Sequence, residues 1–177
     1  MSRPRPTNHE VFFGEEEIIV SKTNLRGHIT YANEVFTRIS GFSHAELIGV
    51  PHSLIRHPQM PRCVFKLLWD TIQQGREIFA YVVNLAKNGD HYWVLAHVTP
   101  TFDAQGRIVG YHSNRRCPDR EAINAVAPLY AELLAVEERV GGNAGMTAAF
   151  NLLVNKLADL DQTYDEWVWS LQGAAAC

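Results

Sequence analysis

Hydrophobic and polar positions along the chain predict five β-strands, most of them joined by tight turns. The strongest turn signal is Asn88-Gly89, because both residues tolerate positive φ and aromatic and β-branched runs flank them. Gly27 and Gly106 end two further turn sequences. Strands linked by such short turns pair in an antiparallel sheet. The predicted strands cover residues 18–23, 28–31, 79–83, 92–99 and 107–114.

Between the second and third predicted strands, apolar residues recur at helical spacing. Asn33 stands at the N-cap position of a helix over 34–40, and Ser43 with Glu46 forms a capping box that opens a second short helix. Three prolines within 50–61 exclude a long helix there. A longer amphipathic helix over 62–74 follows, with Val64, Phe65, Leu68, Trp69 and Ile72 on its apolar face.

This order of elements predicts an α+β domain. Its five-stranded antiparallel sheet carries the short helices on one face. A sheet covered by helices on one side only leaves the opposite face free for a partner.

From Pro118 onward the pattern is helical only. Helices are predicted over 119–140 and 146–160, with a break at 141–143, and a capping box of Thr163 and Glu166 opens a short final helix. This tail is too apolar to stay solvated, so it packs on the domain, on itself or on a second subunit. The chain divides into an N-terminal arm (1–16), a central domain (17–117) and a C-terminal helical extension (118–177). The arm becomes ordered only if Phe12 and Phe13 dock on something.

Composition excludes several classes of function. The 177 residues carry a formal net charge of −3 without a basic stripe, which argues against nucleic-acid binding. The three cysteines, Cys63, Cys117 and Cys177, have no paired or metal-ligand spacing, and we expect reduced thiols. The sequence shows neither an apolar signal segment nor a membrane span, so we expect a soluble cytoplasmic protein.

The candidate chemistry centres on one amide. Asn84 continues an apolar strand, where a buried and unpaired amide would be costly, so we expect a partner for it. The residues of the chain form no catalytic triad, paired carboxylates or phosphate loop, and its eight histidines form no metal cluster. The sequence therefore predicts a protein that is not an enzyme and holds no metal.

Several short motifs together resemble a PAS domain, and more closely the FAD-binding PAS domain of bacterial aerotaxis receptors. The combination of Arg-His-Pro, the helix Trp and Asn-Gly-Asp-His-Tyr-Trp is more specific than any one motif. The resemblance extends from about residue 17 to residue 130. Its motifs are 29–33 (Ile-Thr-Tyr-Ala-Asn), 40–42 (Ser-Gly-Phe), 47–49 (Leu-Ile-Gly), 56–58 (Arg-His-Pro), 87–93 (Lys-Asn-Gly-Asp-His-Tyr-Trp) and 110–111 (Gly-Tyr).

The resemblance implies the PAS fold, with FAD held noncovalently between the helices and the sheet. It implies a redox- or oxygen-responsive signalling sensor that relays the state of the flavin through protein contacts. The residues it links to flavin binding are Asn33, Arg56, His57, Trp69 and Asn84. The sequence departs from the receptor pattern at Gln59, at Ile78 and at Leu85-Ala86, which puts the flavin affinity in question.

Other readings of the same residues stay open. Asn84 can pair with backbone across the sheet, Trp69 can be core, Arg56 can cap a helix, and Trp93 suits ordinary sheet packing. A haem-binding PAS gas sensor would use one axial histidine, from among His57, His91, His97 and His112. A cofactor-free PAS dimerisation module and a flavoenzyme are further alternatives. Cys63 lacks the sequence context of a photochemical thiol.

Two partners are expected. One is a second copy of the chain, bound through Phe12-Phe13 and the helices after Pro118. The other is a separate signalling protein.

Overall fold

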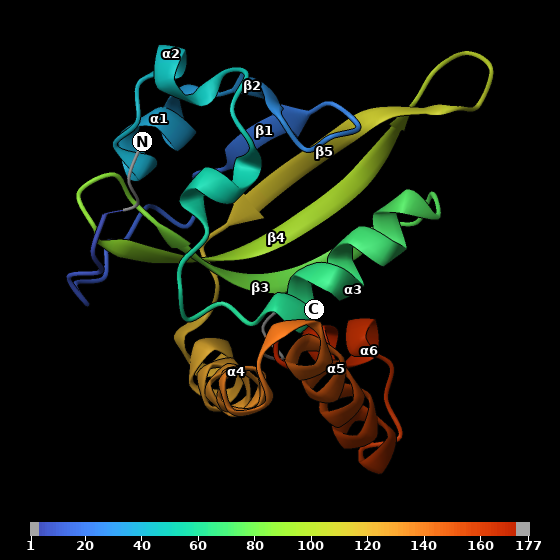
Figure 1. Ribbon diagram of the computed structural model, residues 1–177. Helices are drawn as coiled ribbons and strands as arrows, with labels where there is room; N and C mark the ends of the chain where they lie inside the picture. Colours follow the sequence, from blue (N-terminus) through green and yellow to red (C-terminus); the bar gives the residue numbers. More distant parts are fainter. Residues whose placement is uncertain (1–3, 173–177) are drawn as a thin grey trace.

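A five-stranded antiparallel sheet forms the centre of the molecule in the computed structural model, which describes residues 4–172. The spatial order of the strands is β2-β1-β5-β4-β3, so the first hairpin joins the last strand at the middle of the sheet (Figure 1). This architecture confirms the predicted α+β fold. The strands are β1 (Ile19–Thr23), β2 (Ile29–Ala32), β3 (Ile78–Leu85), β4 (His91–Phe102) and β5 (Ile108–Arg116).

Helices lie on both sides of this sheet (Figure 1). Those between β2 and β3 are α1 (Glu34–Ser40), α2 (His44–Leu47), the 3-10 helix η1 (His52–Ile55) and α3 (Arg62–Gln73). The C-terminal ones are α4 (Arg120–Val140), α5 (Gly142–Asp159) and α6 (Tyr164–Ser170). Asn33 caps α1 and the Ser43–Glu46 capping box opens α2, as the sequence predicts.

Alternation along the strands assigns each side chain to one of two faces. On β3 and β4, the pairs Val82–Val94 and Asn84–Tyr92 face the same side, and Ala96 of β4 lies opposite Arg115 of β5. This side, the inner face, lies against η1 and α3. The side chains of Phe79, Tyr81, Val83 and Trp93 point to the other side, the outer face.

The outer face is covered by the chain's own tail along β3 and β4. The Tyr130 hydroxyl of α4 donates to the Tyr81 carbonyl at 2.7 Å, and its ring lies 6.2 Å from that of Trp93. Trp169 of α6 packs 4.7 Å from the ring of Phe79. The expectation of a free face is therefore wrong for this half of the sheet, because the apolar stripe of α4 requires a surface to cover it.

The N-terminal arm docks beside the turn between β3 and β4. Backbone hydrogen bonds join Thr7 N to Gly89 O at 2.9 Å and Val11 N to His91 O at 2.7 Å. Phe13 is buried, whereas Phe12 is 66% exposed beneath the guanidinium of Arg120. Only one of the two phenylalanines is thus anchored within the chain.

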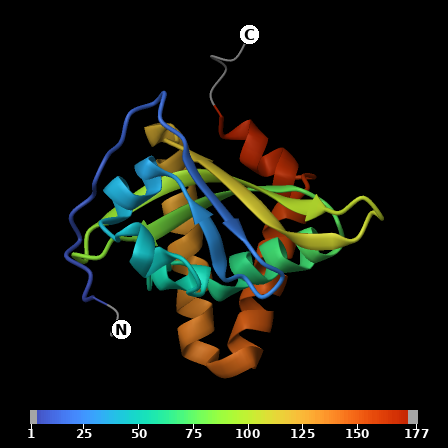
Figure 2. The ribbon, with the colours of Figure 1, turned by 90° about the horizontal axis from the view of Figure 1, so that it is seen from above.

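Helices α4 and α5 form an antiparallel pair that packs on α3 (Figure 2). The break between them is shorter than predicted, because α5 begins at Gly142 and not at residue 146. Gly141 alone ends α4, with φ of 78° and ψ of 160°. Gly145 lets the helices close, because a Cβ there would lie 2.5 Å from the carbonyl oxygen of Glu137. The tail therefore packs both on itself and on the domain.

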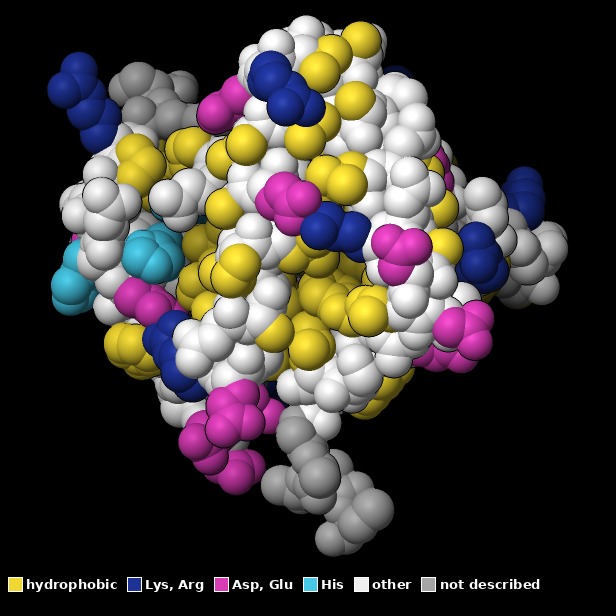
Figure 3. Space-filling view, turned by 90° about the horizontal axis from the view of Figure 1, so that it is seen from below, with side chains coloured by type: hydrophobic (Ala, Val, Ile, Leu, Met, Phe, Trp, Pro, Cys, Tyr) yellow, Lys and Arg dark blue, Asp and Glu magenta, His cyan; other side chains and the backbone are white. Residues whose placement is uncertain are grey.

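Seen from the side of these helices, the molecule presents apolar side chains among scattered charges (Figure 3). Within residues 4–172, the apolar stretches of the helices are too short or too charged for a membrane span. Cys177, one of the three cysteines, falls outside the described residues.

Tyr130→Phe should lower the free energy of unfolding by about 1 kcal/mol, since it removes a buried hydrogen bond to the Tyr81 carbonyl. Urea unfolding followed by circular dichroism measures the change. Tyr31→Phe is the matched control, because Tyr31 is 44% exposed. Equal stability of the two variants would contradict the docking of α4 on the outer face.

Candidate functional site

A cavity of about 420 Å³ lies between the inner face of the sheet and the helices η1 and α3. Its size is within the range of small-molecule and cofactor sites. Val82, Ala96 and Val98 form an apolar floor on β3 and β4. On the opposite side, α3 contributes Phe65, Leu68, Trp69 and Ile72, four of the five residues of its predicted apolar face.

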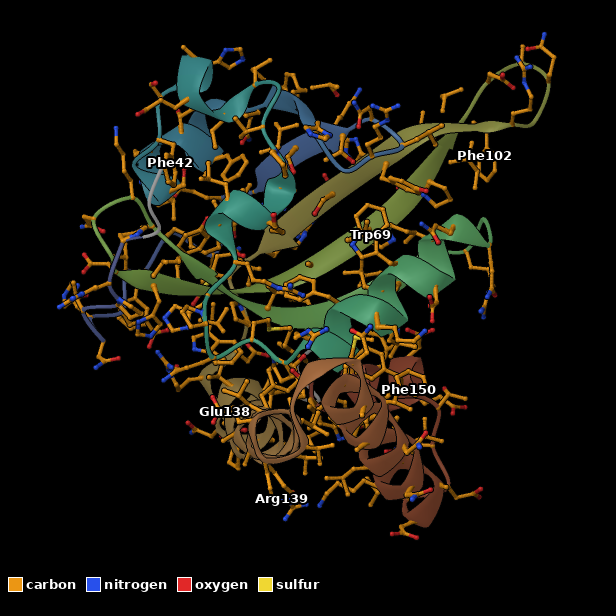
Figure 4. The ribbon with its side chains drawn as sticks, viewed as in Figure 1. Phe42, Trp69, Phe102, Glu138, Arg139 and Phe150 are labelled. Carbon is orange, nitrogen blue, oxygen red and sulfur yellow. The ribbon has the colours of Figure 1, made fainter. Side chains whose placement is uncertain are left out.

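Trp69 forms one wall of this cavity. Figure 4 shows its side chain on the side of α3 that faces the sheet. The ring meets Tyr111 of β5 edge-on, with 5.4 Å between ring centroids. Gly27, at φ +75°, allows the close approach of the first hairpin, since a Cβ there would lie 3.0 Å from the indole. The indole is thus fixed between two parts of the sheet.

Asn84 lies on the floor of the cavity and is 4% exposed. Its Nδ2 has no hydrogen-bond partner. The backbone of Asn84 is bridged to that of Arg56 in the loop after η1, which brings the two residues together. An unpaired buried amide costs about 1–3 kcal/mol, so its retention on a cavity floor favours a ligand that accepts from it.

Arg115 is a second buried donor at the same cavity, and the sequence analysis missed it. It is 2% exposed, and its Nη2 donates to Ser21 Oγ at 2.6 Å. Its Nε and Nη1 have no partner. The guanidinium lies 4.3 Å from the centre of the Phe36 ring. Burial lowers the pKa of Arg115 to about 10, so the group stays charged at neutral pH.

The neighbouring histidine adds no charge. Burial and the positive charge of Arg115 lower the pKa of His52 to about 3. His52 Nε2 lies 3.2 Å from Ser21 Oγ, which therefore contacts both side chains. Arg115 is thus the charged group at this end of the cavity.

Basic side chains also line the rest of the cavity wall. They are Arg26, Arg56, Arg62 and Lys66, and none of the described residues that line the cavity is acidic. The Arg56 guanidinium lies 3.8 Å from the centre of the Phe65 ring, a cation–π contact that orients it. Charges of one sign in a concave site attract a ligand of the opposite sign.

Three of the five predicted site residues, Arg56, Trp69 and Asn84, come together at this cavity. The other two do not line it. Asn33 Oδ1 accepts from the backbone N–H groups of Val20 and Phe36, each at 3.0 Å, and Nδ2 donates to Ile18 O at 2.8 Å. The amide of Asn33 is therefore fully used as a helix cap and a strand connector.

His57 is the other predicted residue that lies away from the cavity. It is 1% exposed, and its Nδ1 accepts from Gln59 N at 3.2 Å. Its ring lies 5.6 Å from that of His91, and burial together with His91 lowers its pKa to about 4. His57 thus packs as a neutral imidazole beside the β3–β4 hairpin.

The histidines and acidic residues give little support to a metal or haem site. Of the four histidines in the haem alternative, only His112 is among the residues that line the cavity, and its Nε2 lies 3.0 Å from Asn114 Oδ1. Within residues 4–172, no three side chains of His, Cys, Asp or Glu gather in a metal-binding group. The cavity is marked instead by the buried donors of Asn84 and Arg115 and by the four basic side chains on its wall, which we call the basic rim.

Comparison with known proteins agrees with this geometry. The model of the PAS fold family matches residues 29–115. The chain is 40% identical over 134 residues to the aerotaxis receptor of Escherichia coli, a match that covers 76% of this chain and 26% of the receptor. It is 31% identical over 102 residues to the nitrogen fixation regulatory protein of Klebsiella pneumoniae, covering 58% of this chain and 21% of that protein. The chain thus spans about a quarter or less of these relatives.

Solved structures share the fold. One, from a study of a flavin analogue in a light-oxygen-voltage domain, has a TM-score of 0.57 at 16% identity and covers 62% of this chain and 84% of that one. The dark structure of the blue-light photoreceptor Aureochrome1 LOV has a TM-score of 0.53 at 24% identity, covering 69% and 85%. The family match, the receptor identity and the fold together show that this chain belongs to the PAS family.

Proposed function

We propose that this chain is a PAS sensor that binds FAD noncovalently in the cavity and relays its redox state through protein contacts. The observation that carries the proposal is the pair of buried donors, Asn84 Nδ2 and the free N–H groups of Arg115, at an apolar cavity. Such a cavity suits a planar ring with acceptor atoms along one edge. The pyrimidine side of a flavin has carbonyl oxygens and ring nitrogens of this kind.

The remaining lining fits the rest of an FAD molecule. Phe65, Leu68 and Trp69 give apolar and aromatic surface against which a flat ring can pack. Arg56, Arg62 and Lys66 would meet the negative charge of a pyrophosphate through charge-assisted hydrogen bonds. The basic rim therefore favours FAD over the uncharged riboflavin.

A bound flavin would supply the exchange of one or two electrons. The protein's part follows from its residues. The fixed charge of Arg115 stabilises negative charge that develops beside it, in a site whose burial strengthens the interaction. The amide of Asn84 can offer its N–H or its carbonyl, so a change of protonation beside it changes the hydrogen bonding of β3.

A path from the cavity to the tail starts at β3 itself. Asn84 lies on the same strand as Tyr81, whose carbonyl accepts from Tyr130 of α4. A separate signalling protein that receives this change is also part of the proposal. The outer-face residues Lys22 and Asn114 on β1 and β5 are polar and offer it a surface.

Self-association is proposed through the exposed ring of Phe12 and the C-terminal helices, with Phe13 held inside the chain. We propose a cytoplasmic location and no enzymatic turnover. A haem-bound gas sensor and a cofactor-free dimerisation module remain the outcomes that would replace the flavin proposal.

The absorption spectrum of the purified full chain, taken as isolated and after addition of FAD, is the first test. We expect the two bands of an oxidised flavin and release of FAD on denaturation, identified by chromatography. A Soret band would replace flavin with haem. No chromophore even after addition of FAD would favour the dimerisation module.

Asn84→Ala and Trp69→Ala should each weaken FAD binding about tenfold or more, because one removes a buried donor and the other a wall of the cavity. Fluorescence titration of FAD measures the affinity, and far-ultraviolet circular dichroism checks the fold. Matched controls are Asn114→Ala on the outer face and Trp169→Ala, whose indole is 50% exposed. Unchanged affinity in both test variants would place the flavin elsewhere.

Arg115→Met should lower the midpoint potential of the bound flavin by about 30 mV or more, a tenfold change in a two-electron equilibrium, because the positive charge favours the electron-rich state. Redox titration of the bound chromophore measures it. Arg116→Met is the control, because the adjacent side chain is exposed. Arg115→Lys keeps the charge and should restore most of the potential. An unchanged midpoint potential in Arg115→Met would exclude this role of the buried cation.

A further inference from the structure

Helix α3, which forms the wall of the cavity, has no side-chain cap of its own. Its N-cap residue is Pro61, which gives no side-chain hydrogen bond. The first backbone N–H groups of the helix bind instead to Glu137 of α4. Oε2 accepts from Arg62 N at 3.0 Å, and Oε1 accepts from Cys63 N at 2.8 Å. A carboxylate at this end of a helix also interacts favourably with the helix dipole.

The side chain of Arg62 ties the same end of α3 to the turn between α4 and α5. Its Nη1 donates to the Gly142 carbonyl at 2.9 Å, and its Nη2 donates to Asn143 Oδ1 at 3.1 Å. We refer to these contacts of Glu137, Arg62, Gly142 and Asn143 as the α3 clamp. Three side chains, Arg62 from α3 and Glu137 and Asn143 from the hairpin, thus hold the start of α3 against the α4–α5 pair.

Glu137 is an acidic residue in a buried helix stripe whose other members are apolar or aromatic. The buried stripe of α4 is otherwise apolar or aromatic along Ile123, Val126, Tyr130 and Leu133, and Glu137 is its next member at 6% exposed. Burying a carboxylate is costly unless hydrogen bonds compensate it. Both of its oxygens are committed to α3, so this residue serves the position of α3 and not the packing of α4 alone.

The opposite side of α3 faces the cavity. Phe65 and Trp69 line it, and so do Arg62 and Lys66, which also contact the tail. Lys66 Nζ lies 5.6 Å from the centre of the Phe150 ring of α5. Figure 4 shows Trp69 on the sheet side of α3 and Phe150 toward α5, with the helix between them. A shift of this one helix would therefore alter both the cavity and the hairpin contact.

We propose that Glu137 is a positioning residue for the flavin cavity, and that ligand occupancy and docking of the α4–α5 hairpin stabilise each other through the α3 clamp. The inference rests on the proposed function, since the ligand is the flavin proposed above. A ligand held by Phe65 and Trp69 restrains α3 from one side, and the α3 clamp restrains it from the other. Coupling between two binding equilibria is reciprocal, so each event strengthens the other by the same factor.

FAD titration of the full chain, freed of flavin, tests the first half of the coupling. Glu137→Ala should raise the dissociation constant about fivefold or more, the lower range of typical coupling between sites. Glu138→Ala is the matched control, because the neighbouring carboxylate is exposed on the outer side of α4 and should change the constant less than twofold. Glu137→Gln keeps the volume but can accept only one of the two N–H groups, so it should give an intermediate value even if the alanine variant folds poorly.

The thiol of Cys63 reports the second half, because it lies next to Glu137 at the clamped end of α3. Cys63 is wholly buried, and burial with the nearby Glu137 carboxylate raises its pKa to about 12, so it reacts only when this junction opens. Alkylation of the peptide that contains Cys63, followed by mass spectrometry, should be slowed by FAD in the unmodified chain and in Glu138→Ala. In Glu137→Gln, FAD should slow alkylation less. The readout is the ratio of the rates with and without FAD in each variant, because loss of the Glu137 carboxylate by itself lowers the pKa of the thiol and speeds alkylation.

The outcomes separate the two proposals. Equal FAD affinity in Glu137→Gln and Glu138→Ala, or a Cys63 rate that FAD leaves unchanged in the unmodified chain, would overturn the coupling while flavin binding stands. A chain that does not bind FAD at all would overturn the proposed function and the coupling together.

Discussion

The requirement that buried polar groups find partners shapes most of this structure. Asn33 meets it by joining β1 to α1, and Tyr130 meets it on the carbonyl of Tyr81. Glu137 meets it on two backbone N–H groups that have no other cap. In each case a polar side chain connects segments far apart in the sequence. The inner face of the sheet is different, because Asn84 and Arg115 have donors there that stay unpaired beside a cavity.

That contrast separates side chains whose hydrogen bonds hold the fold together from side chains whose free donors the proposed ligand would use. Asn33 and Asn84 are both amides to which the family resemblance gave the same role. Every hydrogen-bonding atom of the Asn33 side chain has a protein partner, whereas the Nδ2 of Asn84 has none. Leaving a buried donor unpaired costs about 1–3 kcal/mol, more than a typical hydrogen bond contributes, so a ligand that accepts from it would remove a real penalty. Whether each buried hydrogen-bonding atom has a protein partner therefore distinguishes the roles of the two amides better than the residue type does.

The local part of the fold could be predicted from the sequence, and the long-range part could not. The Asn88-Gly89 turn, the cap at Asn33 and the capping box at Ser43 depend on a few neighbouring residues, and the structure has them as expected. The covering of the outer face depends on which surface the apolar stripe of α4 packs against. No local pattern in the sequence specifies that surface. The length of the break after Val140 was overestimated, since glycine signals a break but does not say that α5 resumes at once.

The candidate site shows the same limit. Its wall was predictable because the apolar face of α3 is visible as spacing, and Asn84 was predictable because an amide interrupts an apolar strand. Arg115 carried a usable signal, since Tyr111, Ser113 and Arg115 alternate and so share one face of β5. What the pattern cannot show is that no carboxylate lies opposite it, because pairing of a buried charge depends on the whole fold. The position of His57 away from the cavity could not be predicted for a related reason, since a loop with three prolines has no periodicity that shows which way a side chain faces.

Helix α3 lies between the cavity and the C-terminal helices and contacts both. Trp69 and Phe65 give α3 its face toward the inner side of the sheet, and Glu137 and Arg62 fix its first turn to the tail. The Tyr130 contact with Tyr81 joins the same tail to β3 by a separate route. Two connections that start from the wall and the floor of one cavity therefore converge on one helix, α4. Under the proposed function, a change in the cavity that moves wall and floor differently would be accommodated along α4, and we propose the orientation of this helix as the output of the domain.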